Sequence, residues 1–206
     1  MANKKVKAAP QKQTAAVSLL EYVEMFVFAV AFVILLLSLF LRLCAVDGDS
    51  MNDTLSHGEQ LLISDLFYTP KQGDIIVFHK TDSEFDALNK PIIKRVIAVG
   101  GQYVRVDFVA KKVYVSDDDV FEESEVLSEE SYATYKGFGG GFREVFEGGG
   151  EPLELRVPEG ELFVLGDNRN ISTDSRSEYL GTIEEKYVLG KVLCRITPFS
   201  AFGRVS

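Results

Sequence analysis

The stretch "MFVFAVAFVILLLSLFL", residues 25 to 41, decides the architecture of the chain. Ser38 is the only polar side chain among its 17 residues. In a helix these residues span about 25 Å, and Leu43 extends the apolar surface while Arg42 reaches the membrane interface with its long side chain. The stretch therefore predicts a single transmembrane anchor over residues 19–43.

The flanks of this run favour an uncleaved anchor with one orientation. A cleavable signal peptide has an apolar core of about 7–15 residues and then a small-x-small site. Here "LRLCAV" follows, so a cleavage site and a lipid-modified Cys44 are both disfavoured. Residues 1–18 are polar and predict a disordered tail, whose Lys4, Lys5, Lys7 and Lys12 predict a cytoplasmic N-terminus. Residues 44–206 are then extracytoplasmic.

The charge of this second part excludes one class of partner. Five of the 22 lysines and arginines and two of the 31 acids precede residue 44, which leaves a net charge of −12 after it. Binding to nucleic acid needs a basic surface, so we expect no nucleic-acid partner. Cys44 and Cys194 are too few for a disulfide framework, and whether they pair is left open by the sequence.

The part after the anchor is predicted to be mostly β. Short runs rich in β-branched and aromatic residues are bounded by Gly, Pro or Asp: "GDIIVFHK", "KPIIKRVIAVGG", "QYVRVDFVAKKVYV", "LELRV", "ELFVLGD" and "YVLGKVLCRI". Residues 116–135 contain eight acids and no base, and "GFGGG" and "EGGGEP" follow. We expect a variable excursion at about 107–160, more typical of a solvated loop than of a metal site.

Ser50, in the turn "GDSMNDTL", is the first candidate nucleophile. A serine needs a base, and His57 and His79 lie in surface-like settings. Lys94 stands out because it lies within the apolar run "IIKRVIAV", where strand alternation turns it to the face opposite Arg95. Burial would make it a neutral base, whereas the structural alternative is an edge-strand lysine that discourages aggregation.

A second polar motif, "LGDNRNISTDSRS", covers residues 165–177. It follows an apolar strand and combines Gly, Asp, Asn, Ser and Arg in a short span. This composition is typical of a turn, and it could also orient a catalytic pair. Ser172 could bond an amine, while Asp174 and Arg176 could form an ion pair.

With these motifs in the order "GDSMNDTL", "GDIIVF", "KRVIAVGGQ" and "GDNRNISTDSRS", the chain resembles a type I signal peptidase from residue 20 onward. That family contains membrane-anchored Ser-Lys proteases that remove signal peptides from exported proteins. The resemblance implies an extracytoplasmic antiparallel β-sheet or barrel-like peptidase domain over residues 44–206. It also implies location in a bacterial cell membrane, with the lipid bilayer and preproteins as partners and with no metal or cofactor.

The resemblance assigns roles residue by residue. Ser50 is implied as the nucleophile, Lys94 as the general base and Met51 as lining for the small side chains that precede the cleavage site. The supporting residues would be Ser172, which helps to hold the lysine, the Asp174–Arg176 ion pair, and Gly166, Asp167 and Asn168 at the start of the last motif.

Several positions depart from the family pattern. Asp53 stands where proline is usual, and Gly48 stands where some members have a serine that donates to the oxyanion, so backbone N–H groups would form the hole. Ala98 and Gln102 replace a glycine and an acid.

Three alternatives remain at this point. The first is an autocleaving repressor, which the apolar span disfavours. The second is a sortase-like transpeptidase that uses Cys194, although its usual Thr-Leu-x-Thr-Cys motif is absent. The third is a non-catalytic membrane-anchored β module, which Asp53 supports.

Overall fold

A computed structural model describes residues 15–81, 89–122, 132–134 and 151–205. The chain divides into two compact units at Phe40–Leu41. The first contains helix α1, Ala15–Phe40. Within it, Leu19–Phe40 is 22 residues long with a mean hydropathy of 2.7, long and apolar enough to cross a membrane. Most of the predicted polar tail, residues 1–14, lies outside the described residues.

The apolar run does not remain helical to its predicted end at residue 43. Leu41–Ala45 form strand β1, which pairs with β2, Gln60–Ser64. The backbone of Leu41 to Leu43 is therefore bonded across a sheet, and Arg42 forms an ion pair with Asp65 at 3.3 Å. Hydrophobicity alone could not mark this change, because an apolar strand and the end of an apolar helix have the same composition.

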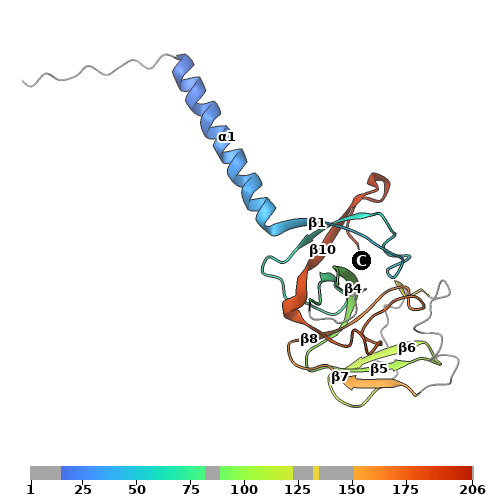
Figure 1. The fold of residues 1–206 in the computed structure, drawn as a ribbon. Coiled ribbons are helices and arrows are strands. Elements are labelled where there is room, and N and C mark those ends of the chain that lie inside the picture. Colours follow the sequence, from blue (N-terminus) through green and yellow to red (C-terminus); the bar gives the residue numbers. More distant parts are fainter. Residues whose placement is uncertain (1–14, 82–88, 123–131, 135–150, 206) are drawn as a thin grey trace, which may run out of the picture. The chain divides into compact units, whose positions relative to one another are not determined.

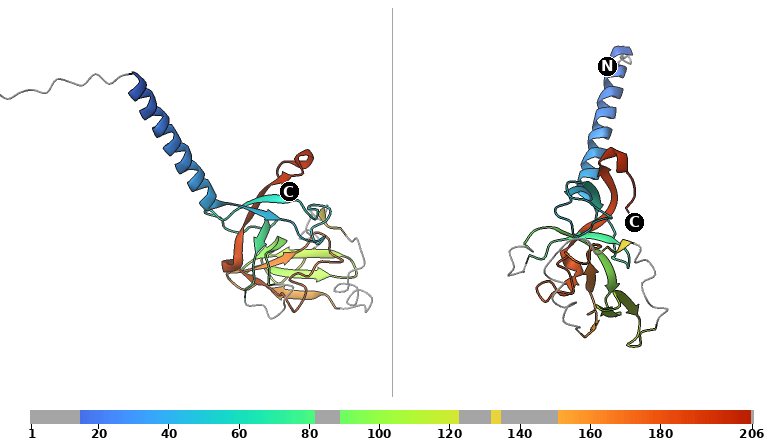
Figure 2. Two further views of the ribbon diagram at one scale, coloured as in Figure 1. Left: turned by 45° about the horizontal axis from the view of Figure 1, so that its top comes forward. Right: turned by 90° about the vertical axis from the view of Figure 1, so that its right-hand side faces the viewer.

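The second unit is built from antiparallel strands (Figure 1; Figure 2). Seven of them form one sheet in the order β1-β2-β10-β3-β4-β8-β9. The remaining bounds in this sheet are β3 Ile75–Phe78, β4 Ile92–Val99, β8 Glu161–Leu165, β9 Ile183–Glu184 and β10 Val188–Thr197. Two short 3-10 helices, Glu185–Tyr187 and Phe199–Ala201, flank β10. The predicted class, mostly β after a single N-terminal apolar helix, is confirmed.

A separate three-stranded sheet has the order β6-β5-β7. Its strands are β5 Tyr103–Asp107, β6 Lys112–Ser116 and β7 Leu153–Arg156. Their apolar side chains, including Val104 and Val113, pack with Phe163 and Leu165 of β8 in one core. The expected excursion at 107–160 is therefore partly a packed sheet, while much of its acidic and glycine-rich sequence lies outside the described residues.

Strand β4 is central, with β3 on one side and β8 on the other. Its register pairs Lys94 with Ile76 and Arg95 with Ile75, so the two basic side chains leave opposite faces of the sheet. Both faces are covered, and both side chains are only 3% exposed. Two buried charged groups in one central strand need specific partners, because an unpaired buried charge is costly.

Candidate active site

Ser50 lies in a compact turn that connects β1 to β2. Gly48, at φ +96°, adopts a backbone conformation that L side chains rarely adopt, and its N–H donates to Nδ1 of His57 at 3.1 Å. After the serine, the N–H of Leu55 donates to the carbonyl of Met51 at 2.8 Å. Met51 and Leu55 are buried in the core with β2 and β3, so this packing anchors the turn.

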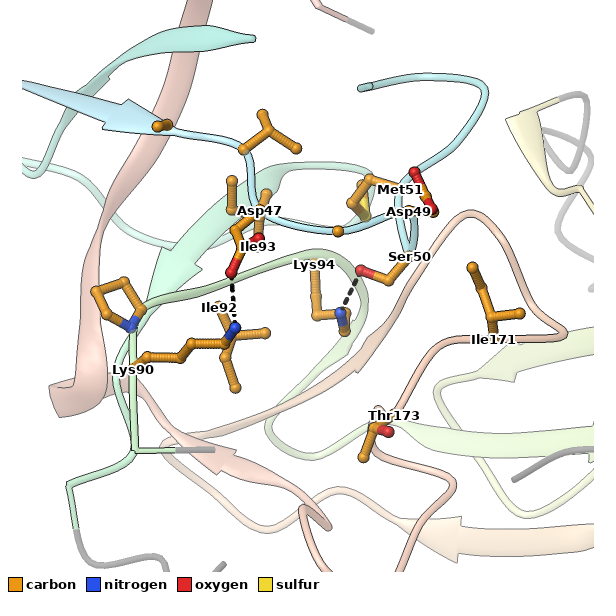
Figure 3. A pocket seen from close by; sticks show the side chains of 14 residues that line it. Asp47, Asp49, Ser50, Met51, Lys90, Ile92, Ile93, Lys94, Ile171 and Thr173 are labelled. Carbon is orange, nitrogen blue, oxygen red and sulfur yellow. Dashed lines mark hydrogen bonds and ion pairs between the residues drawn. The ribbon is translucent and has the colours of Figure 1, made fainter. Parts of the chain in front are cut away.

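Lys94 meets Ser50 across the sequence. A 2.8 Å hydrogen bond joins Nζ of Lys94 to Oγ of Ser50, and Figure 3 shows the two side chains pointing toward one another. The edge-strand hypothesis for this lysine is wrong, because β4 lies inside the sheet. The lysine is only 3% exposed, and such burial is the setting that a neutral lysine needs.

The electrostatics of the site follow from this burial. Desolvation, which disfavours the charged ammonium, lowers the pKa of Lys94 from 10.5 to about 8. Arg176 lowers it too, whereas the negative charges of Asp174 and Asp167 oppose the fall. At pH 7 about one tenth of the amine is then neutral, compared with less than about one thousandth for an ordinary lysine.

The segment after β8 holds the turn of the serine through its backbone. The N–H of Asn168 donates to the carbonyl of Ser50 at 2.9 Å, and its side-chain amide donates to the carbonyl of Asp49 at 3.3 Å. Gly166 is required for this approach, since a Cβ there would lie 2.5 Å from the Ser50 carbonyl oxygen and 2.2 Å from Oγ of Ser172. Gly166 and Asn168 therefore fix where Ser50 stands.

Asp174 and Arg176 form a buried ion pair below this segment. The carboxylate accepts from Nε and Nη2 of Arg176 at 2.6 and 2.8 Å and from the N–H of Gly166 at 3.0 Å. Burial alone would raise the pKa of Asp174, but the charge and hydrogen bonds of Arg176 outweigh burial and hold it below its usual range. The pair expected from the motif is present at bonding distance.

Ser172 is buried nearby, but its hydroxyl has no hydrogen-bond partner at normal geometry among the described residues. It lies close enough to Asp174 to help lower the pKa of that carboxyl. A hydrogen bond from Ser172 to the amine of Lys94, which the resemblance implies, is not formed in this arrangement of the described residues. Ser172 therefore lies beside the Asp174–Arg176 ion pair rather than bonding to Lys94 directly.

Arg95 is the site residue whose partner the sequence did not indicate. Its guanidinium forms a bidentate ion pair with Asp167, at 2.9 Å through Nε and 2.7 Å through Nη2, and Nη1 donates to the carbonyl of Gly73. Asp167 also accepts from the hydroxyl of Thr54 at 2.5 Å. Through this buried pair, Arg95 of β4 is bonded to Asp167 in the segment after β8, and Asp167 is bonded to Thr54 in the turn of Ser50. Arg95 is next to Lys94 in the strand. An arginine in an apolar strand was the available signal, but its partner lies 72 residues away.

A pocket of about 330 Å³ opens beside the serine (Figure 3). Its walls come from β1 and the serine turn (Ala45–Met51), from Lys90–Lys94 at the start of β4, and from Ile171 and Thr173. Met51 is among the residues that line this pocket. Leu62 and Ile63 of the neighbouring strand β2 are not among its lining residues, and Ile63 is in the core.

The histidines are engaged elsewhere. His57 accepts from Gly48 and lies 3.6 Å from Asp47, and Nε2 of His79 is 3.3 Å from the side-chain oxygen of Asn89. In the part of the chain that the structure describes, Ser50 is bonded to an amine and to neither imidazole. A serine hydroxyl bonded to a buried lysine amine, at the edge of a pocket, is an arrangement with which a hydrolase can activate a serine nucleophile.

Comparison with known proteins identifies the family. Residues 19–197 match the family model described as signal peptidase, peptidase S26, and the chain belongs to this family. A probable signal peptidase I-1 of Synechocystis is 32% identical over 185 residues, covering 84% of this chain and 82% of that protein. Signal peptidase IB of Staphylococcus aureus is 32% identical over 183 residues, covering 84% and 88%.

A solved structure of a signal peptidase I from Enterococcus faecalis covers 61% of this chain and 97% of that chain, at 25% identity and a TM-score of 0.37. Family membership makes the chain a serine endopeptidase, a hydrolase that acts on signal peptides. The sortase-like, repressor-like and non-catalytic alternatives are therefore wrong.

Proposed function

We propose that Ser50 is the nucleophile and Lys94 the general base with which this signal peptidase cleaves preproteins. The observation that carries the proposal is the 2.8 Å contact between Oγ of Ser50 and Nζ of a lysine whose pKa is lowered to about 8. A general base works best when its pKa is close to the operating pH, and a lysine reaches that range only through burial of this kind.

Acyl transfer then proceeds in two steps. Neutral Lys94 takes the proton of Ser50 as Oγ attacks the scissile carbonyl carbon, and the ammonium then gives this proton to the departing amine of the mature protein. The signal peptide remains as an ester on Ser50. Water, deprotonated by Lys94, hydrolyses that ester and restores both side chains. The oxyanion is stabilised by backbone N–H groups that include that of Ser50, since Gly48 has no hydroxyl to donate.

The buried ion pairs keep this geometry. Asp174 with Arg176, and Asp167 with Arg95, are each held at two contacts and are almost fully buried. Asn168 holds the carbonyl of Ser50 by a hydrogen bond, and Gly166 leaves the space for its close approach. We assign these residues, together with Ser172, to positioning the serine and the lysine.

We further propose that the pocket takes the small side chains before the cleavage site. Its modest volume and its mixed lining, with Met51 and Ile93 beside Ser50, fit short apolar groups presented by an extended peptide. The lysine-rich tail before the apolar span supports an anchor that leaves the peptidase domain on the extracytoplasmic side of a bacterial membrane. A membrane anchor close in sequence to the serine raises its effective concentration at membrane-borne signal peptides.

Cleavage of a purified preprotein by the full chain in detergent tests the assignment. Ser50→Ala and Lys94→Arg should both abolish cleavage, the second because a guanidinium stays charged. The matched controls are Ser64→Ala, which removes a hydroxyl of β2 that accepts from the N–H of Leu66, and Lys186→Arg, which changes a surface ion pair. Both should cleave at the wild-type rate. Residual turnover by Ser50→Ala, or activity of Lys94→Arg, would show that other groups carry the reaction.

A further inference from the structure

Residues 132–134 form a short isolated segment in contact with the active site. They lie between β6 and β7, in the acidic excursion, and appear as the short yellow segment in Figure 2. The contacts of Thr134 reach loops that are 82 and 33 residues away in sequence.

Thr134 bonds to the two loops that form the site. Its hydroxyl donates to the carbonyl of Asn52, two residues after the nucleophile, at 2.6 Å. Its N–H donates to the carbonyl of Asp167 at 2.7 Å, and its carbonyl accepts from the N–H of Arg169 at 2.7 Å, so that it pairs with Asn168 as a parallel bridge. One threonine thus connects the serine turn to the segment after β8.

Tyr132 adds a contact to the buried ion pair behind the lysine. Its ring centroid lies 3.8 Å from the guanidinium carbon of Arg95, the residue next to Lys94. Arg95 is already bidentate to Asp167, so the ring covers a guanidinium whose edge is occupied. The same short segment therefore contacts the neighbours of both proposed catalytic residues.

Two restraints from the Asp167–Arg169 segment act on the serine turn as a result, one direct and one through Thr134. Asn168 holds it before and at the nucleophile, through the carbonyls of Asp49 and Ser50. Thr134 holds it after the nucleophile, through the carbonyl of Asn52. A hydrogen-bonded serine and base must be held to within a fraction of an ångström, and a turn held on both sides meets that requirement better than a turn held on one.

We propose that Tyr132–Thr134 is a positioning element of the active site, with Thr134 as a positioning residue for Ser50. The segment fixes the turn after the nucleophile against the Asp167–Arg169 loop and touches no reacting atom itself. The inference rests on the proposed roles of Ser50 and Lys94. It gives one part of the acidic excursion a function in catalysis.

The test compares Thr134→Val, which keeps the shape and removes the donor, with Thr134→Ser, which keeps the donor. Steady-state cleavage of a preprotein by the full chain in detergent should show kcat of Thr134→Val reduced about 5- to 50-fold. This range lies between the loss of one hydrogen bond and the about 100-fold cost of a 1 Å misplacement. KM should change less than about twofold, since Thr134 does not line the pocket. Thr134→Ser should return kcat to within about threefold of wild type.

Thr182→Val is the matched control, because the Thr182 hydroxyl also donates to a distant group, Glu161, at the other end of β8. It should leave kcat unchanged even if it lowers thermal stability as much as Thr134→Val. Wild-type kcat in Thr134→Val, or a fall that Thr134→Ser does not restore, would overturn the proposal. Ser50→Ala in the same assay distinguishes a failure of the catalytic assignment from a failure of the positioning role. Residual turnover of Ser50→Ala would overturn the catalytic assignment and the positioning role with it.

If Thr134→Val does not fold, the ring of Tyr132 supplies the second pair of variants. Tyr132→Leu removes the face that covers Arg95 and should lower kcat, whereas Tyr132→Phe keeps the face and should retain most of it. Equal kcat values for these two variants would overturn the positioning role of the segment.

Discussion

Replacing Lys94 with methionine should inactivate the enzyme and stabilise its fold at neutral pH. The lysine is buried with its charged form disfavoured, because its pKa is about 8 in the folded chain compared with 10.5 for an ordinary lysine. At about 1.4 kcal/mol per pKa unit, this difference corresponds to about 3 kcal/mol of unfavourable free energy when the group is protonated in the unfolded chain.

The sign of the effect sets its pH dependence. The unfolded chain binds the proton more tightly than the folded chain, so the cost is fully present below pH 8 and disappears as the pH approaches 10.5. Methionine has a similar length and no charge, but it leaves Oγ of Ser50 without its partner, at a cost of about 1 kcal/mol. Lys94→Met should therefore be more stable than wild type by about 2 kcal/mol at pH 7, and most of this gain should be lost by pH 9.5.

Chemical denaturation of the full chain in detergent, followed by near-ultraviolet circular dichroism of its tyrosines, measures this difference at both pH values. Lys186→Met is the control, because Lys186 is at the surface, paired with Glu184, and should show no such gain. A Lys94→Met variant that is less stable than wild type at pH 7, or whose gain in stability is the same at pH 9.5, would contradict a lowered pKa for Lys94.

Three further changes address the residues around the pair. Ser172→Ala should lower turnover by about 10- to 1,000-fold, because we assign its hydroxyl to positioning the lysine. A wild-type kcat would show that Ser172 is only part of a turn. Gly166→Ala should lose both activity and stability, because its Cβ would lie 2.5 Å from the Ser50 carbonyl oxygen. A wild-type melting temperature and a wild-type cleavage rate for this variant would contradict that expectation. Asp167→Asn leaves Arg95 without its charge partner and should destabilise the fold by about 3–5 kcal/mol. The same chemical denaturation measures this loss, and an unchanged midpoint would contradict a buried ion pair.

Much of the β structure was predictable because the strands β3, β4, β8 and β10 are bounded runs of apolar residues. Strand β1 was not, since Leu41 to Leu43 continue the composition of the helix before them and differ only in their hydrogen-bond partners in β2. The runs of β5, β6 and β7 were predictable as β, but β6 and β7 fall within the expected excursion at about 107–160. Their pairing with β5 in one packed sheet was not predictable, because β7 lies beyond a long acidic segment. Sequence patterns show local periodicity and cannot show such distant pairing.

The site was predictable where chemistry makes a residue unusual for its surroundings. Lys94 is conspicuous in an apolar strand, but whether that strand was central or at an edge depended on β3 and β8 pairing on either side of it. The partner of Arg95 could not be inferred, because Asp167 reaches it only through the fold. Thr134 gave no signal at all, since a threonine in an acidic excursion has no local feature that marks its contact with Asn52.

The pH dependence of kcat/KM for preprotein cleavage tests the lysine-base mechanism most directly. We expect activity to rise with pH along a single limb near pH 8, set by Lys94, and we expect this limb to stay in place in the His57→Ala, His79→Ala double variant. A limb that disappears or moves with the histidines, or activity that is already constant below pH 7, would contradict a neutral lysine as the base for Ser50.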